Sequence, residues 1–375
     1  MKSDSTITIL GSFNTNNGIT TFVKRNYSFL VEKGLRFTFV NIANGSPANE
    51  LSELGNYTEV TQLKHGVFKH IKDLYKVLKK SRETSSIIHM HLDSLHNFIP
   101  ILLAKAVGYK KIIVHAHSDQ RGQYTFPKEI AHRLGMIMTA HLATDFIACS
   151  QYAADFFYSK KTQSKKKFRI ILNGIDLDVY RYNSEKNLAF RSEYNIKKST
   201  LIVGHCGRFA RQKNHPFLVK TFSKLHKVHP NSILVLIGNG ENYNTTKEMV
   251  RKLGLNSSVL FLGYLDDVTS VQNAFDIFAF PSLYEGLSLS LIENVANGTF
   301  CLVSKNQSPE SFLAGNVCGL SIDGNDASEK WVEEIENFSK SNNSDKMENS
   351  RASIKILKEK GITVEKTVSS LLELY

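Results

Sequence analysis

The sequence predicts an α/β protein built from two doubly wound parallel sheets, and three observations support this fold class. Short β-rich runs alternate with helix-like runs along most of the chain, the pattern of parallel strands joined by crossover helices. The length of 375 residues fits two domains, and the hydrophobic fraction of 42% is enough to fill a core in each. A polar stretch at 178–198 interrupts the alternation, so we expect the connection between the domains there.

Two series of strand-like runs divide the chain. The first series consists of residues 6–10, 37–42, 87–91, 111–116, 146–148 and 168–172. The second consists of 201–204, 233–238, 259–263, 277–280 and 301–304, with helical runs at 216–228, 247–253 and 289–296. We expect a first domain at 1–180, a second at 181–355, and a C-terminal helix at 356–375 that packs back toward the first domain. Parallel sheets bind ligands at the carboxyl ends of their strands, so we expect an active site in a cleft between the domains.

The first half of the chain is strongly basic. Of the net charge of +12, residues 1–180 contribute +10 and residues 181–375 contribute +2. One source is a predicted helix at 67–82 with apolar residues on one side and lysines on the other, and a second is the lysine-rich run at 160–167. Either element alone fits an ordinary solvated surface. The summed imbalance favours an anionic partner such as phospholipid head groups, a diphosphate or nucleic acid.

Several classes of protein are disfavoured. The longest apolar run, 98–104, is far shorter than the ~20 residues of a membrane span, and the first residues lack the pattern of a signal peptide. The cysteines show no C-x-x-C spacing, which argues against a disulfide framework or a zinc ribbon. We therefore expect a cytoplasmic protein.

The strongest candidate site follows the predicted strand at 277–280. A short loop carries Glu285 and Gly286, and a helix begins near Ser288 and contains Glu293. Amides in the first turn of a helix lack partners within the helix and can bind phosphate. A carboxylate inside an apolar helix is costly to bury unless it meets hydroxyls or a cation. The two glutamates would then grip two ends of one polyhydroxy ligand. The structural alternative is a helix-entry charge at Glu285 and an exposed position for Glu293.

Two basic residues follow the predicted strand at 201–204. Arg208 and Lys213 lie on a glycine-containing loop before a helix, and such a pair at the carboxyl end of a strand suits a diphosphate. A basic surface loop is the alternative. A third and weaker candidate is the polar loop at 14–21, where Gly18 permits close approach of the backbone to a ligand.

Together these motifs resemble the retaining, nucleotide-sugar-dependent glycosyltransferases of family 4, whose GT-B fold has two Rossmann-like domains facing across a cleft. The matching motifs are Glu285-x7-Glu293, Gly207-Arg208-Phe209 with Lys213-Asn214, Asn173-Gly174-Ile175-Asp176, and Phe280-Pro281-Ser282. The similarity extends from residue 11 to about 319. His115-Ala116-His117-Ser118 adds a likeness to bacterial capsular and exopolysaccharide transferases.

The resemblance implies a catalytic set of Glu285, His117, Arg208 and Lys213. Arg208 and Lys213 would hold the donor diphosphate and stabilise the departing nucleotide. Glu285 would contact hydroxyls of the donor sugar, Glu293 would bind those of the ribose, and His117 would sit beside the donor sugar. Retention in this family is explained by attack on the same face of the sugar, so no side-chain nucleophile is implied.

The resemblance also implies donor contacts from the backbone. These would come from Gly18, Gly286, Leu287, Ser288 and Leu289. The sequence departs from the family in the first loop, where a glycine doublet is reduced to Asn17-Gly18, and in the loop that reads Gly238-Asn239-Gly240. Neither departure removes a principal donor contact.

Two histidine pairs invite a metal interpretation. His89-x-His91 and His115-x-His117 each place two imidazoles on one face of a strand. Zinc sites usually add cysteines or carboxylates at short spacing, and few lie nearby. We therefore expect no metal site and no cofactor.

The sequence thus predicts a metal-independent retaining glycosyltransferase of bacterial surface polysaccharide synthesis. It would move a hexose or N-acetylhexosamine from a nucleotide-sugar, a UDP-sugar in the first instance, to a glycan acceptor. The basic first domain suggests an acceptor linked to a polyprenyl diphosphate and a peripheral position on the inner face of the membrane. One alternative is a catalytically inactive partner of an active transferase. Another is a nucleic-acid-binding protein, which is disfavoured because no RNP, finger or zipper pattern is present.

Overall fold

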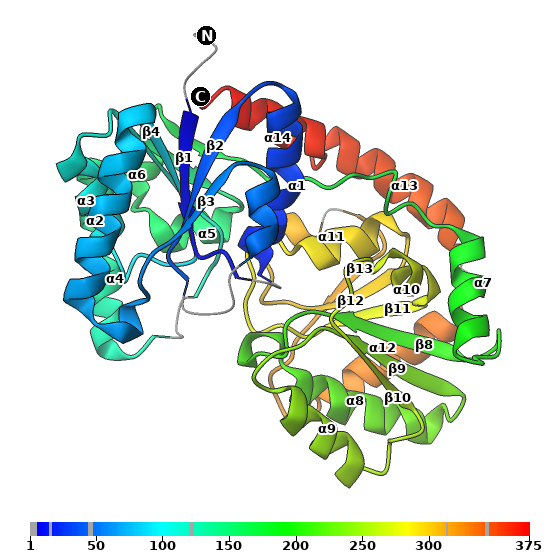
Figure 1. Ribbon diagram of the computed structural model, residues 1–375. Coiled ribbons are helices and arrows are strands. Elements are labelled where there is room, and N and C mark those ends of the chain that lie inside the picture. Colours follow the sequence, from blue (N-terminus) through cyan, green and yellow to red (C-terminus); the bar gives the residue numbers. More distant parts are fainter. Residues whose placement is uncertain (1–5, 15–16, 44–47, 121–123, 313, 342–344) are drawn as a thin grey trace. The chain divides into compact units, whose positions relative to one another are not determined.

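The computed structural model describes residues 6–14, 17–43, 48–120, 124–312, 314–341 and 345–375. The chain forms two compact units, Met1–Asn173 together with Val364–Tyr375, and Gly174–Thr363. Each unit contains one parallel sheet with helices packed against it (Figure 1). The predicted fold class of two doubly wound parallel sheets is therefore confirmed.

The sheet of the first unit has the strand order β3-β2-β1-β4-β5-β6-β7 in the described residues. Its strands are β1 (Thr6–Gly11), β2 (Arg36–Asn41), β3 (Asn56–Glu59), β4 (Ile87–Leu92), β5 (Lys111–Ala116), β6 (Asp145–Ala148) and β7 (Phe168–Ile170). The order reverses direction between β1 and β4, which makes their carboxyl ends the switch point of this sheet.

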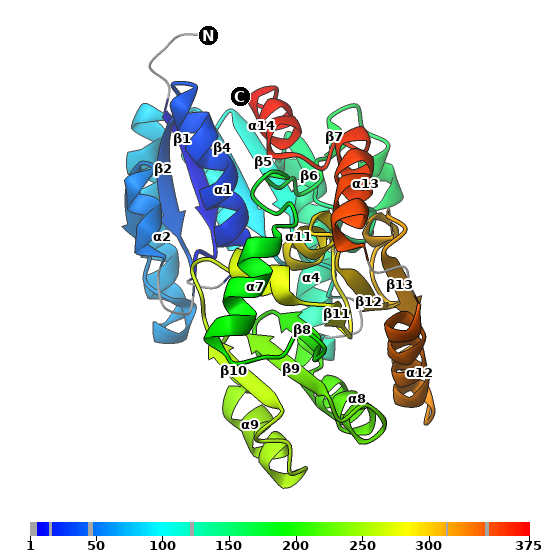
Figure 2. The same cartoon turned by 90° about the vertical axis from the view of Figure 1, so that its right-hand side faces the viewer.

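Helices cover both faces of the first sheet. The helices α1 (Gly18–Glu32) and α14 (Val364–Leu372) pack together on the face that carries Ile7 and Ile9 (Figure 2). The opposite face, which carries Leu10, packs against α2 (Val67–Thr84), α3 (Ile99–Val107) and α5 (Gln151–Phe157). Two further helices, α4 (Phe126–Leu142) and the short α6 (Lys160–Gln163), complete the unit, and α4 packs beside α3. The alternation of Ile9 and Leu10 between two cores is the period of two expected of a buried strand.

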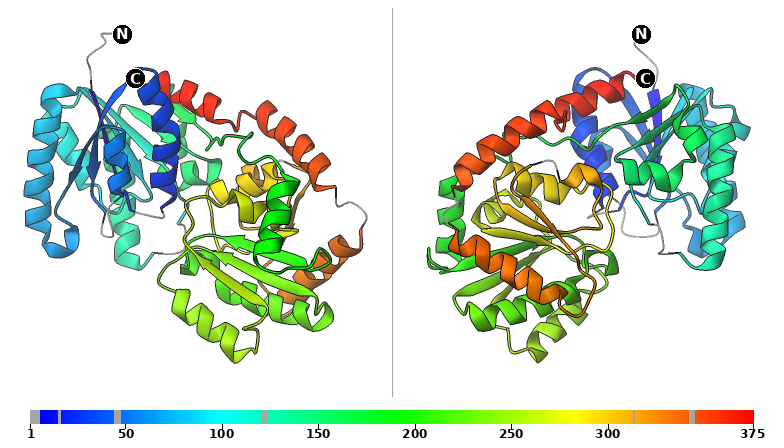
Figure 3. Two further views of the ribbon diagram at one scale, coloured as in Figure 1. Left: turned by 45° about the vertical axis from the view of Figure 1, so that its right-hand side comes forward. Right: turned by 180° about the vertical axis from the view of Figure 1, so that it is seen from behind.

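The sheet of the second unit has the order β10-β9-β8-β11-β12-β13 in the described residues. Its strands are β8 (Leu201–Cys206), β9 (Ser232–Ile237), β10 (Val259–Gly263), β11 (Ile277–Phe280), β12 (Phe300–Ser304) and β13 (Val317–Leu320). The helices α8 (His215–Val228), α9 (Tyr243–Lys252) and α12 (Ala327–Lys340) pack on one core with the buried Trp331 (Figures 1 and 3). The other helices are α7 (Ser184–Glu193), α10 (Thr269–Ala274), α11 (Leu289–Ala296) and α13 (Lys346–Glu359). Within the described ranges, no helix combines the length and apolar character that crossing a bilayer requires.

The polar stretch at 178–198 differs from the expected connection, because it forms a helix of the second unit. Asn183 caps α7 by accepting hydrogen bonds from the amides of Glu185 and Lys186. The side chain of Arg191 is buried and forms an ion pair with Asp276 at 3.0 Å, which anchors this polar helix without a large apolar face. The division between the units falls after Asn173 instead of at residue 180.

The C-terminal segment also differs from a single helix at 356–375. Residues 346–359 form α13 in the second unit, and the chain turns at Gly361, whose φ of 71° favours glycine. From Val364 onward the chain belongs to the first unit, where the hydroxyl of Thr367 donates to the carbonyl of Leu172. The strands β3 and β13 were missed because both are short, and no residue of either strand is fully buried.

Candidate functional site

The candidate site in the second unit lies at the carboxyl ends of two neighbouring strands. β8 and β11 are adjacent, with Ile277 opposite Val203, and the strand order reverses direction between them. The loop after β8 carries the predicted cations and the loop after β11 carries Glu285. This adjacency is why residues 72 positions apart come together at a switch point, the usual place for a ligand in such sheets.

Lys213 and Glu285 form the centre of this site. The Nζ of Lys213 lies 2.7 Å from Oε1 of Glu285, and the two side chains are only 13% and 10% exposed. The same ammonium lies 4.4 Å from the centre of the Phe280 ring, a cation–π contact. Two residues that the sequence analysis assigned to the site therefore form one direct ion pair, which is largely shielded from water.

The backbone of two loops holds this ion pair in place. The amide of Leu283 donates to the carbonyl of Gln212, and the side-chain amide of Gln212 donates to the carbonyl of Tyr284. A Cβ at Gly207 would lie 3.0 Å from Cε of Lys213, so glycine there leaves room for the lysine stem. The loop geometry thus fixes the ammonium through its neighbours as well as through Glu285.

The Gly238-Asn239-Gly240 loop supports the loop after β8. Gly238 and Gly240 have φ values of 129° and 156°, and a Cβ at either would press on the backbone of Gly207 or Phe209. These glycines therefore serve close packing between loops.

Glu293 lies inside α11 and is buried, so the exposed position considered as an alternative is wrong. Its Oε2 accepts a hydrogen bond from Nε2 of Gln272 at 3.3 Å. Removal from water raises the pKa of Cys206 to about 12, and the Glu293 carboxylate adds to this rise while Lys213 opposes it. Cys206 at the end of β8 therefore lies close enough to Glu293 and Lys213 for both charges to affect its pKa.

Two buried imidazoles beside Lys213 are held neutral. Burial lowers the pKa of His205 to about 4, partly opposed by its hydrogen bond to the carbonyl of Ala279. Burial also lowers the pKa of His215 to about 2, with smaller contributions from His205 and Lys213, and its ring stacks on Phe209 at 4.0 Å. Neutral rings avoid repulsion with the lysine, so the positive charge is concentrated at one ammonium.

Arg208 does not join the pair of Lys213 and Glu285, although we expect Arg208 and Lys213 to hold the same diphosphate. Its Nη2 lies 3.0 Å from Oε2 of Glu241, and the arginine side chain is 62% exposed. An exposed pair of this kind is weak and readily exchanged for another anion. The structure therefore joins Lys213 with Glu285 and leaves Arg208 on the same loop with a different carboxylate.

The predicted backbone contacts lie at the start of α11. Gly286, Leu287, Ser288 and Leu289 lead from the Glu285 loop into the first turn of this helix. Ser308 fixes the loop by donating its hydroxyl to the carbonyl of Gly286 at 3.0 Å. The first-turn amides, with the positive end of the helix dipole, lie directly after the ion pair in the chain.

Gly18 and His117 belong to the first unit. Gly18 begins α1, and a Cβ there would meet no atom of the described residues within 4 Å, so neither their packing nor an unusual φ requires glycine. His117 follows β5 and is partly exposed, with its ring nitrogen Nε2 2.8 Å from Nδ1 of His91. Residues 15 and 16 of the predicted polar loop lie outside the described residues.

The histidine pairs of the first unit do lie on one face of the sheet. His89, His91 and His115 each place a ring nitrogen within 4.8 Å of the others, as three metal ligands could. However, the rings of His89 and His115 stack with 9° between their planes, and both nitrogens of His91 already make hydrogen bonds. In-plane lone pairs of parallel rings do not converge on one ion. The expectation of metal independence stays a prediction.

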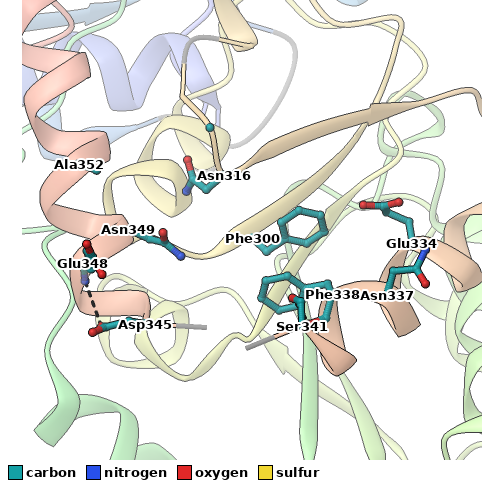
Figure 4. A pocket seen from close by; sticks show the side chains of 11 residues that line it. Phe300, Asn316, Glu334, Asn337, Phe338, Ser341, Asp345, Glu348, Asn349 and Ala352 are labelled. Carbon is teal, nitrogen blue, oxygen red and sulfur yellow. Dashed lines mark hydrogen bonds between the residues drawn. The ribbon is translucent and has the colours of Figure 1, made fainter. Parts of the chain in front are cut away.

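A separate cavity of about 610 Å³ opens elsewhere in the second unit (Figure 4). The stacked rings of Phe300 and Phe338 lie on one side, and Asp345, Glu348 and Asn349 of the α13 end lie on the other. Asp345 already caps α13 by accepting from the amides of Met347 and Glu348. No predicted site residue lines this cavity.

Sequence reasoning missed the residues that support the site from a distance in the chain. Gln272, which binds Glu293, lies in a six-residue helix with no recognisable motif. Tyr375 contacts His89 across 286 positions, and only the return of α14 to the first unit brings it there. The H-x-H spacing did mark His91, although as a metal ligand candidate.

Two family models match the chain. One described as "Glycosyltransferase Family 4" matches residues 16–179, and one described as "Glycosyl transferases group 1" matches residues 187–355. Similar structures include Anabaena HepE in complex with UDP-glucose, with a TM-score of 0.80 and 16% identity over 98% of each chain. WaaG, a glycosyltransferase involved in lipopolysaccharide biosynthesis, gives 0.77 at 14% identity over 97% of this chain and 99% of WaaG. At such identities these structures support the fold, which is GT-B.

Curated relatives agree with the family models. A putative glycosyltransferase EpsF of Bacillus subtilis is 32% identical over 223 residues, 58% of this chain and 57% of that protein. The UDP-Gal:alpha-D-GlcNAc-diphosphoundecaprenol alpha-1,3-galactosyltransferase of Escherichia coli is 25% identical over 263 residues, 69% of this chain and 67% of that protein. The matches thus span about three fifths to two thirds of these relatives. The motifs, the two matched models and the fold lead to one conclusion: the chain belongs to the family 4 glycosyltransferases.

Proposed function

We propose that this chain is a retaining glycosyltransferase that moves a hexose or N-acetylhexosamine from a UDP-sugar to a glycan acceptor in bacterial surface polysaccharide synthesis. The observation that carries the proposal is the shielded contact between Lys213 and Glu285 at the β8–β11 switch point. The names of the E. coli relative and of the HepE complex support a UDP-sugar and a lipid-linked acceptor by analogy.

The hydrogen-bonding capacity of the pair suits a sugar diphosphate. The Lys213 ammonium has three donors, and Glu285 takes one of them. A second N–H can bind a diphosphate oxygen, while the remaining carboxylate capacity of Glu285 accepts from a sugar hydroxyl. One preformed pair would therefore contact both sides of the bond between sugar and phosphate.

The nucleoside end would bind deeper along α11. Glu293 is buried close to Cys206, and a carboxylate there can accept both hydroxyls of a ribose. The first-turn amides of α11 supply phosphate donors. Arg208 would exchange the carboxylate of Glu241 for a diphosphate oxygen. This exchange costs little free energy because the ion pair with Glu241 is exposed.

In the proposed reaction, the bond between the anomeric carbon and the leaving diphosphate oxygen breaks. The acceptor hydroxyl attacks from the same face, and its proton passes to the departing diphosphate. Lys213 and Arg208 stabilise the negative charge that develops on that leaving group. Because the attack occurs on the same face, no covalent enzyme intermediate is needed, and the role we propose for His117 is a contact with the donor sugar.

The test combines turnover with donor binding. Purified full-length protein is supplied with UDP-sugars and a polyprenyl-diphosphate-linked glycan, and UDP release is measured. Glu285→Gln and Lys213→Ala should each lower turnover at least a hundredfold while leaving the fold intact by circular dichroism. Lys224→Ala removes an exposed ion pair with Glu329 and serves as the matched control. Wild-type turnover in either site variant would overturn the assignment. Donor binding without turnover on any acceptor would favour the inactive-partner alternative.

We further infer that one face of the first unit docks on anionic phospholipid. The lysines of α2 at positions 69, 72, 76, 79 and 80 are exposed, as is Phe68 at 90%. The predicted apolar side of this helix is only partly correct, because Val67 is also exposed. Exposed aromatic and basic side chains on one helix are typical of a membrane interface.

The neighbouring α4 adds an apolar stripe to the same face. Phe126, Ile130, Leu134 and Ile137 recur at helical spacing and are all 45% or more exposed. The helix α3 packs against both α2 and α4, so the helix with the stripe and the helix with the lysines belong to the same layer of the first unit (Figure 1). A stripe of this kind on an otherwise well-packed unit indicates an interaction surface.

Liposome co-sedimentation tests the membrane surface. Each lysine near an acidic surface is worth about 1 kcal/mol, so replacing Lys72 and Lys76 by Gln should lower binding to acidic vesicles roughly thirtyfold at low salt. Ile130→Ser should weaken binding to the same vesicles, whereas Leu188→Ser, on α7 of the second unit, should not. Equal binding of wild type to neutral and acidic vesicles would contradict the role of charge.

A further inference from the structure

A chain of hydrogen bonds runs from His117 through the first unit to Tyr375. Nε2 of His117 lies 2.8 Å from Nδ1 of His91, and Nε2 of His91 lies 2.8 Å from the hydroxyl of Tyr27. The Tyr27 hydroxyl lies 2.7 Å from that of Tyr375, which in turn lies 2.7 Å from Nδ1 of His89. Each of these four contacts has the length of a good hydrogen bond.

The fold holds this chain rigidly. β4 and β5 pair in register with His91 opposite His115, and alternation along the strands places His89, His91 and His115 on one face. That face packs against α1, whose Phe22 ring contacts His91, His115 and His117 at 5.0–5.7 Å between ring centres. Tyr27 and His91 are completely buried. Their rings have little freedom to adopt another hydrogen-bonding pattern.

Each imidazole in the chain carries a single ring proton. Burial lowers the pKa of His91 and of His89 well below the ordinary value, with like-charge repulsion from neighbouring imidazoles adding to the effect. Burial likewise raises the pKa of Tyr27 and Tyr375, so both hydroxyls keep their protons. The Tyr27 hydroxyl also lies 3.1 Å from Nδ1 of His89, so Tyr27, Tyr375 and His89 form a closed triangle that reaches His91 through Tyr27. With one proton per group, donation between this triangle and His117 must run in one direction or in the other.

The surroundings of His89, at the end of this series of hydrogen bonds, decide between the two directions. If His117 donated to His91, donation would continue through Tyr27, directly or by way of Tyr375, to Nδ1 of His89. His89 would then carry its proton on Nε2, which is buried and has no hydrogen-bond partner among the described residues. A buried N–H without an acceptor is rare and costs about 1–3 kcal/mol, whereas an unused acceptor is better tolerated.

In the opposite direction every proton has an acceptor. Nδ1–H of His89 donates to Tyr375, Tyr375 donates to Tyr27, and Tyr27 donates to Nε2 of His91. Nδ1–H of His91 then donates to Nε2 of His117. We propose that His91, backed by Tyr27 and Tyr375, is a positioning residue that fixes His117 as the tautomer with its proton on Nδ1. His117 is therefore a hydrogen-bond donor at that nitrogen.

The consequence for sugar transfer rests on the proposed function. A histidine fixed with Nδ1–H can donate to a hydroxyl oxygen of the donor sugar, which is the part of the donor that the proposed function assigns to His117. Loss of the hydrogen bond between His91 and His117 should therefore lower the rate of sugar transfer while leaving the affinity for UDP unchanged.

Nitrogen-15 NMR of histidine-labelled full-length protein tests the tautomer without any substrate. The signals of His117 are assigned by their loss in His117→Gln. In the wild type, Nδ1 of His117 should show the shift of a protonated nitrogen and Nε2 that of an unprotonated one. His91→Leu should shift both nitrogens toward the average of a mixed population. His91→Asn, whose amide can replace Nδ1–H, should retain the wild-type pattern.

Kinetics provide the second readout. His91→Leu should lower kcat about tenfold or more with an unchanged Kd for UDP, and His91→Asn should recover most of the loss. Tyr27→Phe removes the donor to His91 and supplies an independent variant should His91→Leu fail to fold; it too should mix the His117 tautomers. A wild-type His117 protonated on Nε2, or a tautomer insensitive to both His91→Leu and Tyr27→Phe, would overturn the proposal. If the tautomer is as expected and no donor is turned over, the positioning stands and the proposed function fails.

Discussion

The ion pair between Lys213 and Glu285 permits a quantitative prediction, because its two members can be removed separately and together. At 2.7 Å and an effective dielectric constant of ~20, the gross attraction is about 6 kcal/mol. Desolvation of two largely shielded charges offsets much of this attraction. The remaining ammonium in Glu285→Gln keeps its contact with Phe280 and an amide acceptor, which limits the loss.

We therefore expect Glu285→Gln and Lys213→Met each to lower the free energy of unfolding of the second unit by about 3 kcal/mol. The double variant should lose about the same amount, because neither charge is then left buried alone. The resulting coupling energy is roughly 3 kcal/mol, well above the ~0.5 kcal/mol within which independent substitutions add. The exposed pair of Lys224 and Glu329 is the control and should couple by less than about 1 kcal/mol.

The protein contains its own probe for this measurement. Trp331 is the single tryptophan of the chain, is fully buried, and packs in the core of the second unit. Its fluorescence during guanidinium denaturation reports that unit directly. Additive losses in the double variant, within about 0.5 kcal/mol, would show that Lys213 and Glu285 do not share one shielded contact, and the site would have to be rebuilt.

Three further changes test other parts of the site. Gly18→Ala meets no atom within 4 Å, so we expect thermal stability to be unchanged or slightly higher while the KM for the donor rises; an unchanged KM would remove Gly18 from the donor site. Glu241→Gln frees Arg208 from its exposed partner and should tighten UDP binding up to about fivefold by calorimetry, whereas weaker binding would place Glu241 itself in the site. The folded pKa of His205 is about 4, below its ordinary 6.5, so its contribution is complete above pH 6.5 and is lost as pH falls toward 4. Between pH 6.5 and pH 5 the free energy of unfolding of the second unit should fall by about 1.6 kcal/mol more in wild type than in His205→Asn, as followed by Trp331 fluorescence. An equal loss in both proteins would contradict burial of His205 as a neutral imidazole.

Much of the fold was predictable because strand and helix periods are local properties of the sequence. The runs at 201–204 and 277–280 predicted β8 and β11. The family resemblance implied that Lys213 and Glu285 serve one donor site, and the adjacency of these two strands explains why they meet. By contrast, α7 was read as a linker because its stability comes from the buried Arg191, whose partner Asp276 lies 85 positions away.

The parts that escaped prediction depend on side-chain choices at the surface or on distant pairing. Arg208 has a long, exposed side chain, and its selection of Glu241 over the ion pair depends on loop geometry that no spacing encodes. The contact of Tyr375 with Tyr27 requires the chain to return to the first unit after 190 residues in the second. Motif spacing therefore predicted the candidate site residues, whereas only the structure shows what holds their side chains in place.

The arrangement around Lys213 explains why a buried ion pair would be retained where an apolar pair would be more stabilising. Replacing such a pair by well-packed apolar residues is often neutral or favourable for stability. Here the pair fixes an ammonium beside the neutral imidazoles of His205 and His215, so the positive charge is in place before any anion arrives. A diphosphate that binds there gains a charge-assisted contact without the entropic loss of ordering a lysine side chain. Under the proposed function, the stability lost in the unliganded protein corresponds to a preorganised positive charge, which would stabilise a leaving group whose negative charge increases during the reaction.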